Sequence, residues 1–204
     1  MADETLIVNM ALRSLGANPI ANLDENTPSG KLAKQTFAAY RDSFLTSHPW
    51  KFATMQASIP SDSTAPTWGW TYAYSLPVEP TFCLRALHVN GEGIESGMWQ
   101  PREHKIYTNI ASPLEITFVY RSTAYGYWGA QAVDALAAYL AMNWAMPVTQ
   151  QSTIVQEQEA LYEKKFRRAR ATNGAEGTPV MLEANTWVDA RFSGEYIRLV
   201  EPAE

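Results

Sequence analysis

The chain has 204 residues, of which 46% are hydrophobic and 18% are charged, and this composition indicates a folded protein rather than a disordered one. Its formal net charge of -5 argues against tight wrapping around nucleic acid, because the phosphates repel an acidic surface. The single cysteine, Cys83, excludes a disulfide within the chain and disfavours a cysteine-based zinc site.

Neither a membrane span nor a secretory signal is predicted. No apolar run approaches the ~20 residues that a membrane-spanning helix needs. The first ten residues, MADETLIVNM, lack a basic start and a cleavage site. We therefore expect the chain to be made in a cytoplasm and to stay there, or in an assembly built there.

Two amphipathic helices are predicted in the first fifty residues. Asp3 is placed to cap the first helix, and Gly16 is a suitable residue just past its end. The second helix begins at Thr27-Pro28. Its apolar stripe, spaced by four, three and four residues, consists of Ala33, Phe37, Tyr40 and Phe44. The polar side chains mostly off this stripe, which we expect to face water, are Lys31, Lys34, Arg41 and Asp42.

The second helix ends at a group of residues that we interpret as structural anchors. His48 precedes Pro49, and the residue before a proline disfavours the helical region. Trp50 and Phe52 follow at once as bulky side chains of an extended segment.

From Lys51 the period changes from 3.6 to 2, which predicts β-strands. The clearest strands are expected over residues 68–76, 83–89 and 114–121, and weaker ones over 52–59 and 104–108. Asn90-Gly91 is a typical turn signal after the second of these. Residues 51–121 are therefore interpreted as one small antiparallel sheet inserted between helices.

Helical spacing returns near Tyr125. Pro147 is expected to end a third, largely buried helix, and a fourth is predicted over residues 150–172. The last thirty residues show no helical period and are interpreted as an extended arm. The predicted fold class is α+β: an antiparallel four-helix bundle with an inserted small antiparallel β-sheet and an extended C-terminal arm. Its parts are the helical residues 1–50 and 122–173, the β region 51–121 and the arm 174–204.

The search for catalytic, metal and cofactor sites yields no candidate. The three histidines, His48, His88 and His104, stand in no metal-ligand spacing with one another or with the cysteine. Gly91-Glu92-Gly93 is better explained as a hairpin loop than as a phosphate loop, because no helix follows it. We therefore predict no enzyme activity, no metal and no cofactor, although carboxylate pairs for glycoside hydrolysis are not visible in a sequence.

Two patterns are candidate binding surfaces. The aromatic stripe Trp68, Trp70, Tyr72 and Tyr74 either stacks on sugars or bases or packs the sheet onto its neighbours, and we favour packing. The basic run of the fourth helix either contacts phosphate, or complements the helix dipole and acids on a partner, and we favour the second interpretation. The predicted contacts to a neighbouring chain combine this run with arm residues: Lys164, Lys165, Arg167, Arg168, Arg170, Trp187, Arg191 and Tyr196.

One family has a similar order of motifs. The matching residues begin with Asn9 to Ala17, then Pro19-Ile20, Leu23-Asp24-Glu25, Thr27-Pro28, Tyr40-Arg41-Asp42 and His48 to Ala53. Softer matches follow at Tyr74 to Pro77, at Tyr120-Arg121 and at Thr186 to Arg191. In these residues the chain resembles the tail tubular protein A family of tailed phages and prophages, the neck adaptors below the portal.

The resemblance implies a structural virion protein of the tail or neck, assembled in the host cytoplasm. Members of this family form a dodecameric ring between the portal protein and the tail nozzle, a tail tubular protein B-like partner. They help to seat tail fibres in short-tailed phages. Genome DNA passes through the ring during ejection, so we expect passage without sequence-specific binding, and no membrane contact. The fourth helix and the arm are expected on the portal side, and the loops 60–67 and 91–103 on the nozzle side.

Two other functions stay open at this stage. A saccharide-binding or saccharide-degrading tail component would use the stripe from Trp68 to Tyr74, exposed beside paired carboxylates. A DNA-binding module would use residues 164–170 and show salt-sensitive binding.

Overall fold

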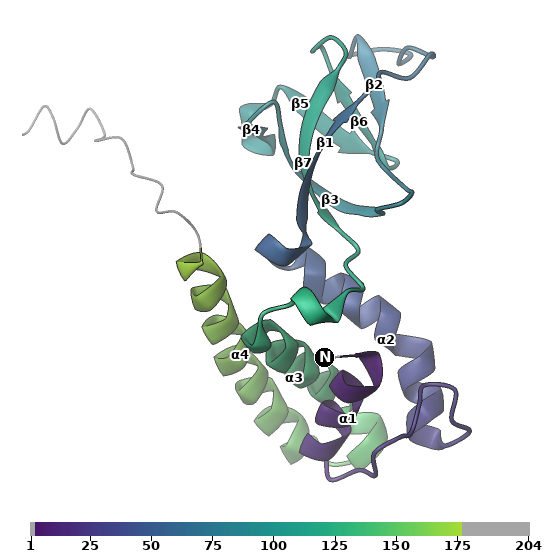
Figure 1. Cartoon of the computed structure of the whole chain (residues 1–204), viewed down its shortest axis with the longest axis vertical. Helices are drawn as coiled ribbons and strands as arrows, with labels where there is room; N and C mark the ends of the chain where they lie inside the picture. Colours follow the sequence, from purple (N-terminus) through teal and green to yellow (C-terminus); the bar gives the residue numbers. More distant parts are fainter. Residues whose placement is uncertain (1–2, 177–204) are drawn as a thin grey trace, which may run out of the picture. The chain divides into compact units, whose positions relative to one another are not determined.

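The structure is a computed structural model that describes residues 3–176 (Figure 1). Four α-helices are present in this range: α1 (Glu4–Ser14), α2 (Pro28–Thr46), α3 (Ala130–Thr149) and α4 (Ser152–Ala175). The strands between α2 and α3 are β1 (Thr54–Ile59), β2 (Tyr72–Ser75), β3 (Cys83–Val89), β4 (Glu92–Gly93), β5 (Trp99–Arg102), β6 (Lys105–Thr108) and β7 (Leu114–Tyr120). Short 3-10 turns occur at Lys51–Ala53 (η1), Ile94–Ser96 (η2) and Tyr125–Tyr127 (η3).

The predicted four-helix bundle with one inserted sheet is wrong, although the chain is α+β. A four-helix bundle needs a continuous apolar seam on each helix. Helix α1 has only 11 residues, against 24 in α4, and α4 fully buries only Gln158, Ala169 and Asn173. Helices α1 and α2 instead pack on α3, which buries ten side chains, while α4 covers them with a half-buried face.

The predicted single sheet is also wrong, because the strands form two antiparallel sheets. Four strands run in the order β1-β7-β3-β4, and three in the order β2-β6-β5. Strand β2 begins only at Tyr72, since Gly69 has a φ of 85° and interrupts the extended chain predicted from Trp68. Strand β5 was not predicted because it contains Pro101, which is tolerated at a sheet edge.

Two helix ends differ from the prediction. Pro147 does not end α3, which continues to Thr149 and closes at Gln150 with a φ of 54°. A proline in the last turn removes one backbone hydrogen bond, a smaller disturbance than in a helix centre. Helix α4 runs past Asn173 to Ala175, because the Asn173 side chain is buried and bonded to the chain before β1.

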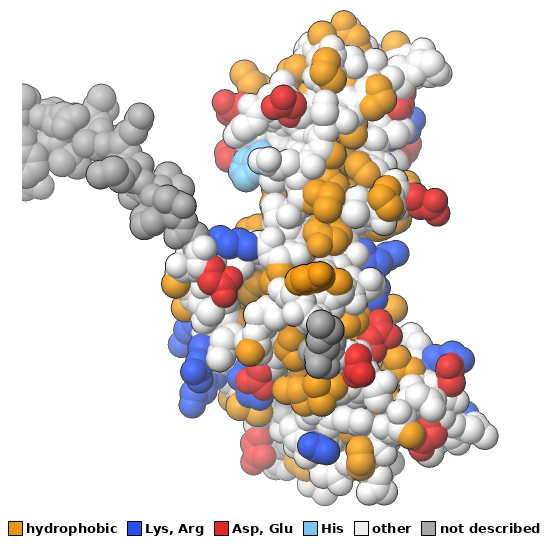
Figure 2. Space-filling view, viewed as in Figure 1, with side chains coloured by type: hydrophobic (Ala, Val, Ile, Leu, Met, Phe, Trp, Pro, Cys, Tyr) orange, Lys and Arg blue, Asp and Glu red, His pale blue; other side chains and the backbone are white. Residues whose placement is uncertain are grey.

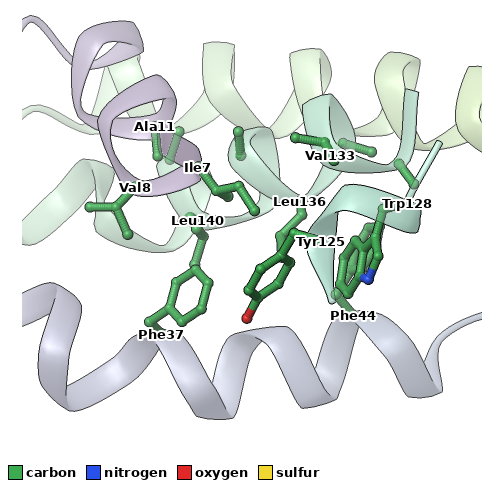
Figure 3. Close-up of a cluster of buried hydrophobic side chains, with 14 of the residues drawn as sticks. Ile7, Val8, Ala11, Phe37, Phe44, Tyr125, Trp128, Val133, Leu136 and Leu140 are labelled. Carbon is green, nitrogen blue, oxygen red and sulfur yellow. The ribbon is translucent and has the colours of Figure 1, made fainter. Parts of the chain in front are cut away.

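The buried hydrophobic side chains of residues 3–176 form two clusters. The first joins α1, α2, α3 and η3, with Phe37 and Tyr125 edge to face at 6.2 Å between ring centroids. In Figure 3 these two rings lie between α2 and the helices above it, beside Leu140 and Leu136. The second cluster lies between the sheets and includes Tyr74, Trp99 and Phe118.

Arg41 does not face water as predicted, because its side chain is only 8% exposed. Its guanidinium lies 2.9 Å from a carboxylate oxygen of Asp42 and 3.7 Å from one of Glu4. Burial by itself lowers the pKa of Arg41, but hydrogen bonds from it to Tyr125 and Asp42 leave this pKa raised. The Tyr125 hydroxyl in turn donates to Glu4 at 2.8 Å.

Asp42 extends this network to the end of β7. Its second carboxylate oxygen lies 2.7 Å from the guanidinium of Arg121, which stands 4.3 Å above the ring of Phe82. One carboxylate thus pairs with two arginines. We name the residues Glu4, Arg41, Asp42, Arg121 and Tyr125 the arginine network.

Replacing Asp42 by alanine should lower the free energy of unfolding by about 3 kcal/mol, because the buried Arg41 then loses its nearer carboxylate partner. Urea unfolding followed by far-UV circular dichroism measures this change. The matched control is Asp24→Ala, which breaks the exposed pair with Lys34 and should leave the free energy of unfolding almost unchanged, because water screens this pair. Equal losses in the two variants would show that the arginine network adds no special stability.

Candidate functional site

The basic run occupies the second half of α4, where successive side chains point around the helix. Lys165 lies toward α3 and pairs with Asp134 at 2.7 Å. Arg170 stands 5.8 Å above the ring of Phe166. Lys164, Arg167 and Arg168 are exposed, and none of them forms an ion pair within residues 3–176.

These three side chains share one face of α4 because residues three and four apart are neighbours on a helix. We call Lys164, Arg167 and Arg168 the α4 basic face. Figure 2 shows Lys and Arg side chains gathered along the edge of the molecule that α4 forms. Three cations that form no ion pair with any described residue, in a chain of net charge -5, make this face a suitable contact for an acidic partner.

The remaining predicted contacts, Trp187, Arg191 and Tyr196, lie outside the described residues, as does the arm beyond residue 176. Of the predicted α4 contacts, the structure therefore places Lys164, Arg167 and Arg168 on one face, while Lys165 pairs with Asp134 and Arg170 stands over Phe166.

The predicted anchors form an aromatic stack. Trp50 is fully buried, lies parallel to Phe44 at 5.0 Å and to Phe52 at 5.7 Å, and donates its indole N–H to the Phe44 carbonyl. Phe52 stacks in turn on Trp128 at 4.7 Å. These rings tie the end of α2 to the segment that leads into α3.

His48 and Pro49 are held by Asn173 near the end of α4. The backbone N–H of Lys51 donates to Asn173 Oδ1 at 3.0 Å, and this fixes which side of the amide faces His48. Asn173 Nδ2 then lies 3.0 Å from His48 Nε2 and 3.5 Å from the Pro49 carbonyl. Because Nδ2 only donates, His48 Nε2 must accept, so the ring is neutral with its proton on Nδ1.

The aromatic stripe does not form one platform. Trp68 is 77% exposed in the loop before β2, Trp70 and Tyr72 are half-buried, and Tyr74 is fully buried. The Tyr74 hydroxyl donates to the Ile110 carbonyl at 2.7 Å. Only Trp68 is thus largely exposed to a ligand, whereas Tyr74 packs in the core. The stripe is split in this way because the strand begins four residues later than predicted.

Two surface features were not predicted from the sequence. Tyr127 is 83% exposed in η3, beside a cleft of about 440 Å³ that Asp3 and Glu4 also line. A second cleft of about 530 Å³ is lined by His88 and His104 among other residues. No period in the sequence marks either feature, since both arise where loops meet strands or helices.

Within residues 3–176, no three His, Cys, Asp or Glu side chains are placed to hold a metal ion. Burial raises the pKa of the Cys83 thiol to about 11. None of the described helices combines the length and apolar character needed to cross a membrane.

The chain matches no family model and no curated protein.

The stability of the protein should fall as pH decreases below about 6.5, because of His48. Burial and the nearby charge of Arg170 lower the pKa of His48 in the folded chain from its ordinary value of 6.5. The unfolded chain therefore binds a proton more readily, so this contribution is complete above the unfolded pKa and is lost as pH falls toward the folded one. Urea unfolding at several pH values between 7.5 and 5.5 measures it.

The matched variant is His48→Gln, whose side-chain carbonyl also accepts from Asn173 but does not titrate. Its free energy of unfolding should change less over the same pH range than that of the parent protein. Parallel pH curves for the two proteins would show that His48 makes no such contribution.

Proposed function

We propose that the protein is a ring-forming head-to-tail adaptor that joins a phage portal to the tail nozzle and forms part of the DNA ejection channel. The observation that carries this proposal is the ordered resemblance of the first fifty residues to the tail tubular protein A family. The proposal includes a homo-oligomeric ring on the portal, the nozzle as the second partner, and DNA that passes through the lumen.

The positions of the resembling residues support the proposal, because many of them make the hydrogen bonds or packing contacts where one secondary-structure element connects to the next. Asn9 binds both the N–H and the carbonyl of Ile20, which shapes the loop between α1 and α2. Thr27 caps α2 through the N–H of Gly30. Arg41 and Asp42 belong to the arginine network, and His48 and Trp50 to the anchors. Related chains that keep one fold need the same contacts at these connections.

The α4 basic face supports the assembly part of the proposal. A head-to-tail ring needs two different complementary patches on each subunit. The exposed cations Lys164, Arg167 and Arg168 provide one patch of a single sign, while the chain as a whole is acidic. In this arrangement the basic face contacts acids of the neighbouring subunit or of the portal.

The native mass of the purified protein, alone and mixed with a phage portal protein, tests the function. A ring formed alone or only on the portal would support the adaptor. A chain that stays monomeric alone and does not bind the portal would contradict the adaptor function. Glycan binding sensitive to Trp68→Ala would then favour the saccharide alternative, because Trp68 is the exposed member of the stripe.

The double charge reversal Arg167→Glu/Arg168→Glu should weaken ring or portal assembly at least about tenfold, since it replaces two attractive contacts by repulsive ones. The control is Arg13→Glu/Lys31→Glu, which makes the same change of charge at two exposed positions on α1 and α2. Native mass spectrometry with the portal measures both. Equal loss in the control would mean that net charge matters rather than the α4 basic face.

A further inference from the structure

Strand β1 is an edge of the four-stranded sheet, and no other strand of residues 3–176 pairs with its outer side. The N–H of Thr54 bonds to the Lys51 carbonyl and not to β7. Glu115 lies opposite Ser58, but its N–H donates to the side-chain Oδ1 of Asn90 and its carbonyl accepts from the N–H of Asn90, on the far side of β7. Since antiparallel pairs alternate, Met55, Ala57 and Ile59 bond to β7, and Gln56 and Ser58 direct their N–H and C=O groups outward.

The other sheet edges in residues 3–176 are protected. Strand β4 has two residues, and β5 contains Pro101 and Arg102. The outer side of β2 is covered by Asp62, whose N–H donates to the Ala73 carbonyl and whose carboxylate accepts from the N–H of Ser75. By contrast β1 has six residues, Thr-Met-Gln-Ala-Ser-Ile, with no charge, no proline and no bulge in its register with β7. Such an edge is a template for another strand.

We infer that β1 pairs with β1 of a second copy of this chain, antiparallel about a two-fold axis. Several two-fold registers bring outward groups together, and the one in which Gln56 of one copy faces Ser58 of the other is preferred, because each of these residues then exchanges both hydrogen bonds with its counterpart. Ala57 lies on the axis opposite its own copy. The two four-stranded sheets become one continuous sheet.

Three further features fit this register. Met55, a side chain that is 37% exposed in the isolated chain, faces Ile59 of the second copy. Thr54 faces Pro60, and neither has a free N–H, so the added ladder ends there without an unpaired donor. Because β1 carries no charged residue, the two-fold axis places no like charges opposite one another.

This inference does not rest on the proposed adaptor function. It concerns the free chain and uses β1, whereas the proposed assembly uses the α4 basic face. A two-fold contact is isologous and closes at two copies, while a ring requires a head-to-tail contact. Either proposal can therefore be wrong while the other holds.

Disulfide trapping tests the register. In Ala57→Cys the two thiols meet across a non-hydrogen-bonded pair with Cα atoms about 4.5 Å apart, which suits a disulfide. Oxidation should give a covalent dimer on a non-reducing gel, with no contribution from Cys83, which is buried. The control Ser58→Cys places the thiol opposite Gln56 of the second copy, diagonal to its own counterpart, and should cross-link far less.

Charge pairing provides a second, independent test by sedimentation equilibrium at low salt. Gln56→Lys/Ser58→Glu places opposite charges across the axis, and Gln56→Lys/Ser58→Lys places like charges there. The first variant should dimerise at least about tenfold more tightly than the second, because each design affects two cross-strand pairs. Both changes are on exposed side chains of the strand, so both variants should fold.

The expected results are thus a cross-link specific to position 57 and opposite responses to the two charge designs. The inference is overturned if the parent chain stays monomeric up to about 200 µM, at which a dimer with a dissociation constant in that range is half-formed. It is also overturned if positions 57 and 58 cross-link equally or if the two charge designs behave alike.

Discussion

The fold depends on the burial of one guanidinium, that of Arg41. A buried cation is stable only when counter-charges and hydrogen-bond acceptors surround it. Here Glu4 comes from α1, Asp42 from α2 and Tyr125 from η3, so three segments must meet at one point. Asp42 then binds Arg121 at the exit of β7. The network therefore fixes where the chain leaves α2 and where it returns from the sheets.

The aromatic stack also connects separate segments of the chain, but through apolar contacts rather than charges. Phe44, Trp50, Phe52 and Trp128 are stacked in series, and they join the exit of α2 to the approach to α3. Dispersion and burial hold these rings but do not by themselves select one arrangement. The hydrogen bonds of Asn173 to the segment from His48 to Lys51 add that selection, since their donors and acceptors fit in only one orientation.

The sequence predicted the local elements better than their assembly. Helices α1 to α4 and strands β3 and β7 follow from periodicity, because burial on one face leaves a regular spacing. Arg41 was expected in water since its position beside the apolar stripe does not reveal a distant Glu4 or Tyr125. The four-helix bundle was expected because four amphipathic segments were counted, whereas α4 lacks the apolar seam. The second sheet was missed because the pairing of strands is not visible in a sequence: β2 and β6 lie in predicted strands that were assigned to a single sheet, and Pro101 hides the period of β5.

The candidate surfaces were predictable only in part, for a related reason. The sequence shows the basic run, but it does not show which of its side chains contact the rest of the protein. Lys165 pairs with Asp134 of α3, and Arg170 stands over Phe166. The edge character of β1 has no sequence signal at all, because it depends on the strand order. A strand with the same six residues at the centre of the sheet would offer nothing to a partner.

The two proposed contacts have different symmetries, and this difference constrains how they combine. A ring built head to tail through the α4 basic face would carry one β1 edge on every subunit. If those edges stayed open, two rings would pair through two-fold axes, and the assembly would become a closed double ring. A neck that continues from portal to nozzle has no such two-fold axes. The adaptor and the β1 pairing are therefore compatible only if β1 pairs in the free chain and is covered by another component, or by a change of the subunit, in the assembled ring.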